Sequence, residues 1–280
     1  MKKTFKHRIV SRYRKNRLLS QILSLTGDPL KNKKWIFIVG CYNSGTTLLD
    51  QILASHTQIS GLPDEGVIFT NQLHRPEDFG WRRMWFRCQE ELNNENPDSN
   101  IIKKHWSHFY DKGKEFLLEK SIANTCRIPF ILKNFAPVYI IHIVRNGYAV
   151  AEGIHRKAFP LENNSFFKKG HYPIELCIKQ WTYSLEEVEK HKGGINNFLE
   201  ISYEDLCENT EEVLSKVTNF LNIESFSKQI LTSSFSVHEK DSKIRNMNER
   251  SISRLSKEDL LKINKVAADH LDQHGYRIIE

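Results

Sequence analysis

The stretch 40–47 combines glycines with hydroxyl side chains in the order Gly-Cys-Tyr-Asn-Ser-Gly-Thr-Thr. An apolar run precedes it and apolar residues at helical spacing follow it, so we expect a strand, a tight turn and a helix. Backbone N–H groups in such a turn, together with the helix N-terminus, form a cradle for an anion. Ser44, Thr46 and Thr47 add hydroxyl donors around Gly45. These features predict a phosphate-binding loop.

The two glycines, Gly40 and Gly45, have the GxxxxG spacing of nucleotide-hydrolysing P-loops. Those loops need a lysine directly after the second glycine, because its charge spans the β- and γ-phosphates. Here that position is Thr46. We therefore expect one phosphate group, held by N–H and hydroxyl donors, in place of the polyphosphate of ATP.

Arg145 is a second candidate phosphate ligand. It ends the apolar run 137–145 and stands directly before Asn146 and Gly147, where a helical pattern begins. The guanidinium fork matches the oxygens of a phosphate. A surface ion pair is the alternative, and we favour phosphate binding.

The elements that position these residues are expected from hydrophobic periodicity. Strands are predicted at 33–40, 115–120, 137–145 and 196–203. Helices are predicted at about 127–134, 174–192, 210–222 and 256–274. Alternating strands and helices predict a three-layer α/β/α fold with a central parallel sheet, in which ligands bind at the carboxyl ends of the strands. Trp181, on the long helix, is expected in the core.

Residues 62–114 differ in composition, since they are aromatic, charged and interrupted by Pro and Asn. We interpret them as an inserted helical cap that selects the substrate, although their tryptophans could equally form a small core of their own. With no internal repeat and no flexible linker, the chain is expected to form one domain, 34–280, behind a basic arm, 1–33.

The positive charge is concentrated in that arm. Residues 1–34 hold 11 Lys and Arg and one acid, whereas the rest of the chain holds 30 bases and 33 acids. We expect a solvated basic helix or tail; the alternative is an arm that contacts anionic lipid or a polyanion. No nucleic-acid recognition module and no apolar stretch of membrane-spanning length is present, and the arm lacks the apolar segment of a signal peptide.

The cysteine and histidine patterns predict no metal site. Five cysteines, widely spaced and without a CxxC pair, argue against a disulfide framework and a zinc ribbon, and they fit a reducing compartment. His105 with His108, and His270 with His274, are spaced like ligand pairs. Without neighbouring carboxylates or thiols, we expect these histidines on the surface.

In the order of its motifs the chain resembles the sulfotransferases that use 3′-phosphoadenosine 5′-phosphosulfate (PAPS). YNSGTT is similar to the family's 5′-phosphosulfate loop, and IIHIVRNGYAVAEGI is similar to its 3′-phosphate element. FLLEKS, the tract FLEISYEDLCENTEEVLSKVTNFLNI and the closing LSKEDLLKINKVAADHLDQHGY also resemble family segments. The resemblance covers most of 34–277 and is nearest to bacterial and tyrosylprotein sulfotransferases.

The resemblance implies roles for individual residues. Ser44, Gly45, Thr46 and Thr47, with Asn43 before them, would bind the 5′-phosphosulfate, and Arg145 the 3′-phosphate. Glu65 would be the catalytic base, with Asp64 as its rival. Lys120 would stabilise the leaving group or be a solvated lysine. Arg250, with Arg245 and Arg254 as alternatives, would close over the nucleotide.

Two positions depart from the family pattern. The cation usual just before SGTT is replaced by Asn43, and a serine usual on the 3′-phosphate is replaced by Gly153. The leading hypothesis is therefore a PAPS-dependent sulfotransferase. The alternatives are a P-loop-like kinase or NTPase, and an inactive nucleotide-binding protein.

The acceptor is less well defined by the sequence. We expect a hydroxyl or amine on a small metabolite or glycan, with no metal required, because the transferred group carries less charge than phosphate. Cytoplasmic placement is expected, and the sequence predicts no oligomeric state.

Overall fold

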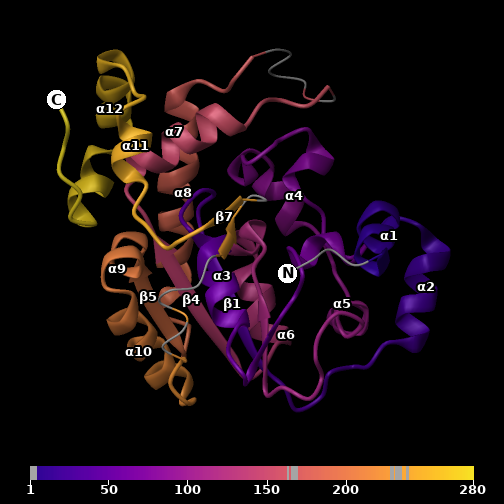
Figure 1. Ribbon diagram of the computed structural model, residues 1–280. Helices are drawn as coiled ribbons and strands as arrows, with labels where there is room; N and C mark the ends of the chain where they lie inside the picture. The colour runs from indigo at the N-terminus through magenta and orange to yellow at the C-terminus, as the bar shows by residue number, and fades with distance from the viewer. Residues whose placement is uncertain (1–4, 163, 165–169, 228–229, 231–234, 238–239) are drawn as a thin grey trace.

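The computed structural model describes residues 5–162, 164, 170–227, 230, 235–237 and 240–280. Its centre is a five-stranded parallel sheet in the order β2-β3-β1-β4-β5 (Figure 1). The strands are β1 (Lys34–Gly40), β2 (Ile59–Gly61), β3 (Phe116–Glu119), β4 (Val138–Val144) and β5 (Phe198–Ser202). The four predicted strands are confirmed, while β2 was not predicted.

The sheet is covered on both faces, which explains why its strands are continuous apolar runs. Alternate residues of β1 pack into different clusters: Ile36 and Ile38 face α3 and α10, and Phe37 and Val39 face the other side. One face carries α3 (Thr46–Ala54), α9 (Tyr203–Glu208) and α10 (Thr210–Leu221). The other carries α6 (Ile128–Asn134), preceded by η4 (Ile122–Arg127), and α8 (Ile174–Lys192). The predicted three-layer α/β/α fold is confirmed.

Further helices cover the end of the sheet where the strands finish. They are α7 (Gly147–Lys157), α11 (Asn248–Ile252) and α12 (Lys257–Gln273), with α12 packed on α8 (Figure 1). A small hairpin, β6 (Phe235–Val237) and β7 (Lys240–Ser242), precedes α11. Trp181 is buried among these helices as expected, and its indole Nε1 donates to the Arg145 carbonyl at 3.0 Å. The core side chain thus helps to fix a predicted ligand residue.

The stretch between β2 and β3 contains five short helices joined by irregular segments. These are η1 (Gly66–Ile68), η2 (Pro76–Phe79), η3 (Trp85–Cys88), α4 (Gln89–Asn93) and α5 (Ser99–Trp106). Its tryptophans do not form a core of their own. Trp81 and Trp85 pack into a cluster with α7 and α8, and Trp106 packs into the cluster under β1. The segment is therefore anchored to the body of the domain on both sides.

The N-terminal arm is helical, as one of the two expectations had it, but it is solvated only in part, because one side of it docks on the fold; residues 1–4 lie outside the described part. The arm forms α1 (Phe5–Tyr13) and α2 (Arg17–Thr26), and α2 packs on α5 (Figure 1). Val10 and Leu23 are buried, and the buried Arg14 forms an ion pair with Asp78.

The expectation of surface histidines is wrong for His105, which is 1 % exposed. Its Nε2 lies 2.9 Å from Ser24 Oγ on α2, and its Nδ1 lies 3.0 Å from Thr70 Oγ1. The imidazole therefore joins the arm to the rest of the fold, which its sequence spacing to His108 did not indicate.

Candidate active site

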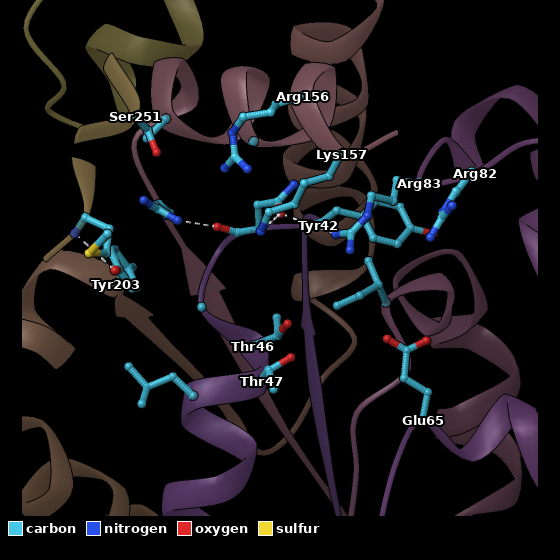
Figure 2. A pocket seen from close by; sticks show the side chains of 18 of the residues that line it. Tyr42, Thr46, Thr47, Glu65, Arg82, Arg83, Arg156, Lys157, Tyr203 and Ser251 are labelled. Atoms are coloured by element: carbon cyan, nitrogen blue, oxygen red, sulfur yellow. Dashed lines mark hydrogen bonds between the residues drawn. The ribbon is translucent and has the colours of Figure 1, made fainter. Parts of the chain in front are cut away.

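A cavity of about 610 Å³ opens where β1 and β4 end. Its walls come from the loop after β1, from α7, from the segment between β2 and β3, and from residues 243–254 (Figure 2). The strands β2 and β3, which follow β1 in the chain, lie on one side of β1 in the sheet, and β4 and β5 lie on the other side. The direction in which strands are added to the sheet therefore reverses at β1. Ligands bind at such a switch point in open α/β sheets.

The loop after β1 has the backbone of an anion cradle. Gly45 caps α3 with φ +89°, and a Cβ atom there would lie 2.4 Å from the Tyr203 ring. Both facts require glycine at this position. Thr46 and Thr47, in the first turn of α3, line the cavity with their side chains (Figure 2). Ser44 Oγ is buried and has no hydrogen-bond partner among the described residues. The loop thus presents donors that nothing in the described protein uses.

Arg145 follows β4 and lies beside this loop. Its Nη1 donates to the Asn43 carbonyl at 2.6 Å, and its Nε donates to Asn248 Oδ1 at 2.8 Å. The guanidinium also stacks on Tyr203, with Cζ 4.2 Å from the ring centroid. Its Nη2 is buried and has no partner in the described protein. The two predicted phosphate-binding elements are therefore brought together, and each keeps a donor for a ligand.

Two cations that the sequence reasoning missed also reach the loop. Arg83 Nη1 lies 3.3 Å from Asn43 Oδ1, and Lys157 Nζ lies 3.2 Å from the same oxygen. Both residues line the cavity (Figure 2). Burial, together with the nearby charge of Arg83, lowers the pKa of Lys157 to about 8. The arginine-rich run at 75–88 was the available signal for Arg83, and Lys157 gave none.

The structure separates the two candidate bases. Glu65 lines the cavity, whereas Asp64 is not among the described lining residues. Asp64 Oδ1 accepts a hydrogen bond from the Glu65 N–H at 2.9 Å. The next residue, Gly66, donates its N–H to Glu119 Oε1 at 2.8 Å. Glu65 is thus held by backbone contacts on both sides, with its carboxylate directed at the cavity (Figure 2).

Lys120 stands behind Glu65. Its Nζ lies 3.3 Å from Glu65 Oε1, and its side chain is 9 % exposed. Burial would lower the pKa of Lys120, but the surrounding carboxylates, Glu65 first, raise it above its usual value. Lys120 therefore carries a charge, and its described contact is with Glu65.

The remaining predicted residues also meet at the cavity. Gly153, inside α7, lines it opposite Asn43. Arg245, Arg250 and Arg254 all line it, so the structure does not single out Arg250. Arg254 differs from the other two in reaching the buried Glu152, at 3.5 Å.

Among the described residues, no group of three or more His, Cys, Asp or Glu side chains could hold a metal ion. No helix in the described part of the chain is both long and apolar enough to span a bilayer.

The family model that matches this chain and the solved structures compared with it below are all of sulfotransferases. The sulfotransferase family model matches residues 36–228. The sulfotransferase domain from the curacin biosynthetic pathway is 20 % identical with a TM-score of 0.56, over 88 % of this chain and 99 % of that one. The sulfotransferase domain from the Synechococcus PCC 7002 olefin synthase is 19 % identical with a TM-score of 0.56, over 89 % and 97 %. Mouse sulfotransferase SULT7A1, complexed with PAP, is 14 % identical with a TM-score of 0.51, over 92 % and 91 %. No curated protein sequence matches the chain.

Proposed function

Because the chain belongs to the sulfotransferase family, we propose that it transfers the sulfuryl group of PAPS to a hydroxyl or amine of a small-molecule or glycan acceptor. The observation that supports the donor best is the contact between the two phosphate-binding elements. Arg145 Nη1 donates to the carbonyl of Asn43, in the loop, at 2.6 Å. This places an arginine and an anion cradle side by side, as a nucleotide with phosphates on both its 3′ and 5′ positions requires.

The donors present in the cavity fit such a nucleotide. Buried polar atoms without partners are costly, and in native proteins such atoms are partnered by a water, an ion or a ligand, or serve catalysis or store strain. Three of them, Asn43 Nδ2, Ser44 Oγ and Arg145 Nη2, belong to the two predicted phosphate-binding elements. Asn43 and Arg145 line the cavity, and Ser44 lies in the loop between two lining residues without lining it itself. The hydroxyls and N–H groups at the start of α3 would hold the 5′ side, and Arg145 would hold the 3′-phosphate.

Bound PAPS would supply an activated sulfuryl group, and the protein would supply position and charge. Glu65 would accept the proton of the attacking hydroxyl or amine, since its carboxylate lines the cavity. Lys120, whose Nζ lies 3.3 Å from Glu65 Oε1, would orient that carboxylate. The cations around the loop would balance the charge that develops on the leaving phosphate oxygen.

Radiolabelled PAPS tests the reaction directly. The purified protein would be incubated with label and with a panel of phenols, amines, amino sugars and glycans. We expect label in at least one acceptor, and loss of that transfer in Glu65→Gln. A protein that binds the nucleotide but labels no acceptor would instead support the inactive nucleotide-binding alternative.

A further inference from the structure

We propose that Arg83 and Lys157 form a cationic clamp on the 5′-phosphosulfate, in place of a charged residue in the loop. This inference rests on the proposed function. The loop 40–47 contains no charged side chain, although the group it would hold is anionic. Charge-assisted hydrogen bonds are the strong contacts in phosphate sites, so the charge has to come from elsewhere in the fold.

The two cations meet at one neutral atom. Arg83 comes from the segment between β2 and β3, and Lys157 is the last residue of α7. Their nitrogens lie 3.3 Å and 3.2 Å from the same oxygen, Asn43 Oδ1. Two positive groups that share one uncharged acceptor repel each other, and an anion between them would relieve that repulsion.

The backbone at Arg83, whose guanidinium reaches Asn43 Oδ1, is strained. Arg83 has φ +59°, a left-handed conformation that non-glycine residues rarely adopt. Met84, the next residue, and Trp81, two residues before, are both buried in one hydrophobic cluster. The packing therefore holds the residue in a conformation it would not choose alone, as is common where a side chain is needed at a ligand.

Asn43 positions the clamp. It also has a left-handed backbone, with φ +63°, and its side chain lies against Gly153 of α7. Because Gly153 has no side chain, the amide of Asn43 fits between α7 and the loop. Its oxygen then holds both cations at the cradle.

The test compares two nucleotides that differ only at the 5′ position. Isothermal titration would measure the affinity for 3′-phosphoadenosine 5′-phosphate (PAP) and for adenosine 3′-phosphate. We expect Arg83→Gln and Lys157→Met each to weaken PAP binding about tenfold or more, since each removes a charged hydrogen bond. Binding of adenosine 3′-phosphate should stay within about twofold of the wild type, because it lacks the group that the clamp contacts.

Matched controls separate the clamp from general effects of charge. Arg87→Gln and Lys179→Met remove one cation each from residues outside the cavity lining, and they should leave both affinities unchanged. Lys157→Arg keeps the charge and should retain most of the PAP affinity. Thermal melting of each variant checks folding.

The outcomes distinguish failure of the clamp from failure of the proposed function. Equal losses for both nucleotides, or no loss for either, would overturn the clamp while leaving the proposed function standing. A wild-type protein that binds neither nucleotide would contradict the proposed function, and the clamp with it.

A different observation concerns the outer face of α2. Leu18, Ile22 and Leu25 recur at helical spacing and are 70 %, 57 % and 85 % exposed. With Tyr13 they make up four of the eight large hydrophobic side chains that are exposed in the described part of the chain. The opposite face of α2 buries Leu23 and packs toward α5, so this apolar stripe faces away from the fold.

From this stripe we infer a contact surface for an anionic membrane, independent of the active site. Arg8 and Arg12 on α1 and Arg17, directly before Leu18 on α2, are exposed, and the sequence up to residue 27 contains no acid. Exposed apolar residues next to arginines are the signature of a helix that lies in the headgroup region of anionic lipid. The charge complementarity favours lipid over a neutral protein surface.

Vesicle co-sedimentation tests this contact. We expect the full chain to bind vesicles of phosphatidylcholine with phosphatidylglycerol, and not vesicles of phosphatidylcholine alone. The triple variant Leu18→Ser, Ile22→Ser, Leu25→Ser should lose binding, as should Arg8→Gln, Arg12→Gln, Arg17→Gln.

Leu261→Ser, which removes a leucine that is 64 % exposed on α12, is the matched control and should still bind. No binding to anionic vesicles, or binding that survives both triple variants, would overturn the inference. So would a wild-type dimer in analytical ultracentrifugation that the leucine variants dissociate, because the stripe would then be covered by a second copy.

Discussion

A Cβ atom added to Gly153 would lie 3.0 Å from Cγ of Asn43, so the side chain of Asn43 fills the space that a larger residue at 153 would need. By the resemblance drawn from the sequence, these are the two positions expected to depart from the sulfotransferase pattern. The structure shows that the two residues are in contact: the Asn43 side chain packs where any side chain at position 153 would project.

This contact predicts that substitutions at Asn43 and Gly153 have non-additive effects on the free energy of unfolding. Gly153→Ala should lower the free energy of unfolding by about 1 kcal/mol, because crowding against Asn43 outweighs the helical preference of alanine. In an Asn43→Gly background the same change should be neutral or stabilising. Urea unfolding of the four proteins measures this.

Gly193→Ala is the control for that cycle, since nothing lies within 4 Å of a Cβ there. It should leave stability nearly unchanged. Equal effects of Gly153→Ala in both backgrounds would show that the two positions are independent.

The assignment of the base predicts a sharp contrast between adjacent carboxylates. Glu65→Gln should lower kcat by about 10²- to 10⁴-fold, with PAP affinity retained, because a general base acts on the chemical step. Asp64→Asn is the matched control and should keep most of the activity, since an asparagine oxygen can still accept from the Glu65 N–H. Steady-state kinetics with an acceptor from the labelling screen measures both. The reverse pattern would make Asp64 the base.

Lys157 predicts a pH dependence of nucleotide binding. Burial, followed by the charges of Arg83, Arg156 and Arg145, lowers its pKa to about 8, and Glu152 opposes this shift. Bound anion favours the charged form, so binding above pH 8 must take up a proton. PAP affinity should therefore be level below that pH and fall by up to about tenfold per unit above it.

Calorimetry in buffers of different ionisation enthalpy, near pH 8.5, would detect the proton uptake, and Lys157→Arg should abolish it. A PAP affinity that stays constant from pH 7 to 9.5 in the wild type would count against a role for Lys157 at the phosphate.

The docking of the arm predicts acid sensitivity. Burial raises the pKa of Asp78, but hydrogen bonds from Lys15, the Arg75 N–H and Arg14 outweigh it and hold the pKa at about 2, below the ordinary 3.8. Because the pKa of Asp78 is lower in the folded state than in the unfolded state, its ionised carboxylate stabilises the folded state at pH values above the ordinary pKa of 3.8. This stabilisation is lost as the pH falls from 3.8 toward the folded-state pKa of about 2. The contribution should be about 2 kcal/mol near neutral pH, with roughly half lost by pH 3.

Urea unfolding of the wild type and Asp78→Asn between pH 3 and 7 measures this contribution. The difference in free energy of unfolding between the two proteins should decrease as the pH falls. Asp272 is exposed, so Asp272→Asn should have the same free energy of unfolding as the wild type at every pH. A difference between the wild type and Asp78→Asn that does not change with pH would mean that the ionised Asp78 adds nothing to the docking of the arm.

Much of the fold was predictable because the local pattern and the tertiary environment agree. The strands β1, β3, β4 and β5 are apolar runs buried on two faces, and the helix at 174–192 matches α8. The strand β2 has only three residues, too few to show a period. The arm was misjudged because its charges suggest solvent, whereas Arg14 is matched to Asp78, 64 residues away.

The residues of the candidate site likewise fall into those that the sequence predicted and those that it did not. The loop and Arg145 were predictable because each follows directly from a strand end. Arg83 and Lys157 were not, since they reach Asn43 across separations of 40 and 114 residues. Such contacts depend on how the cap and α7 are placed around the loop, which periodicity does not encode.

The central claim is that the cavity is built for a nucleotide with phosphates at both the 3′ and 5′ positions. The most direct measurement is a thermal-shift titration of the wild type and Arg145→Gln with PAP, ATP and 5′-AMP. At about 100 times its dissociation constant, PAP should stabilise the wild type by roughly 2.7 kcal/mol, well above the effect of either other nucleotide. Arg145→Gln should lose most of that shift. No shift with PAP, or an equal shift with ATP, would contradict the account.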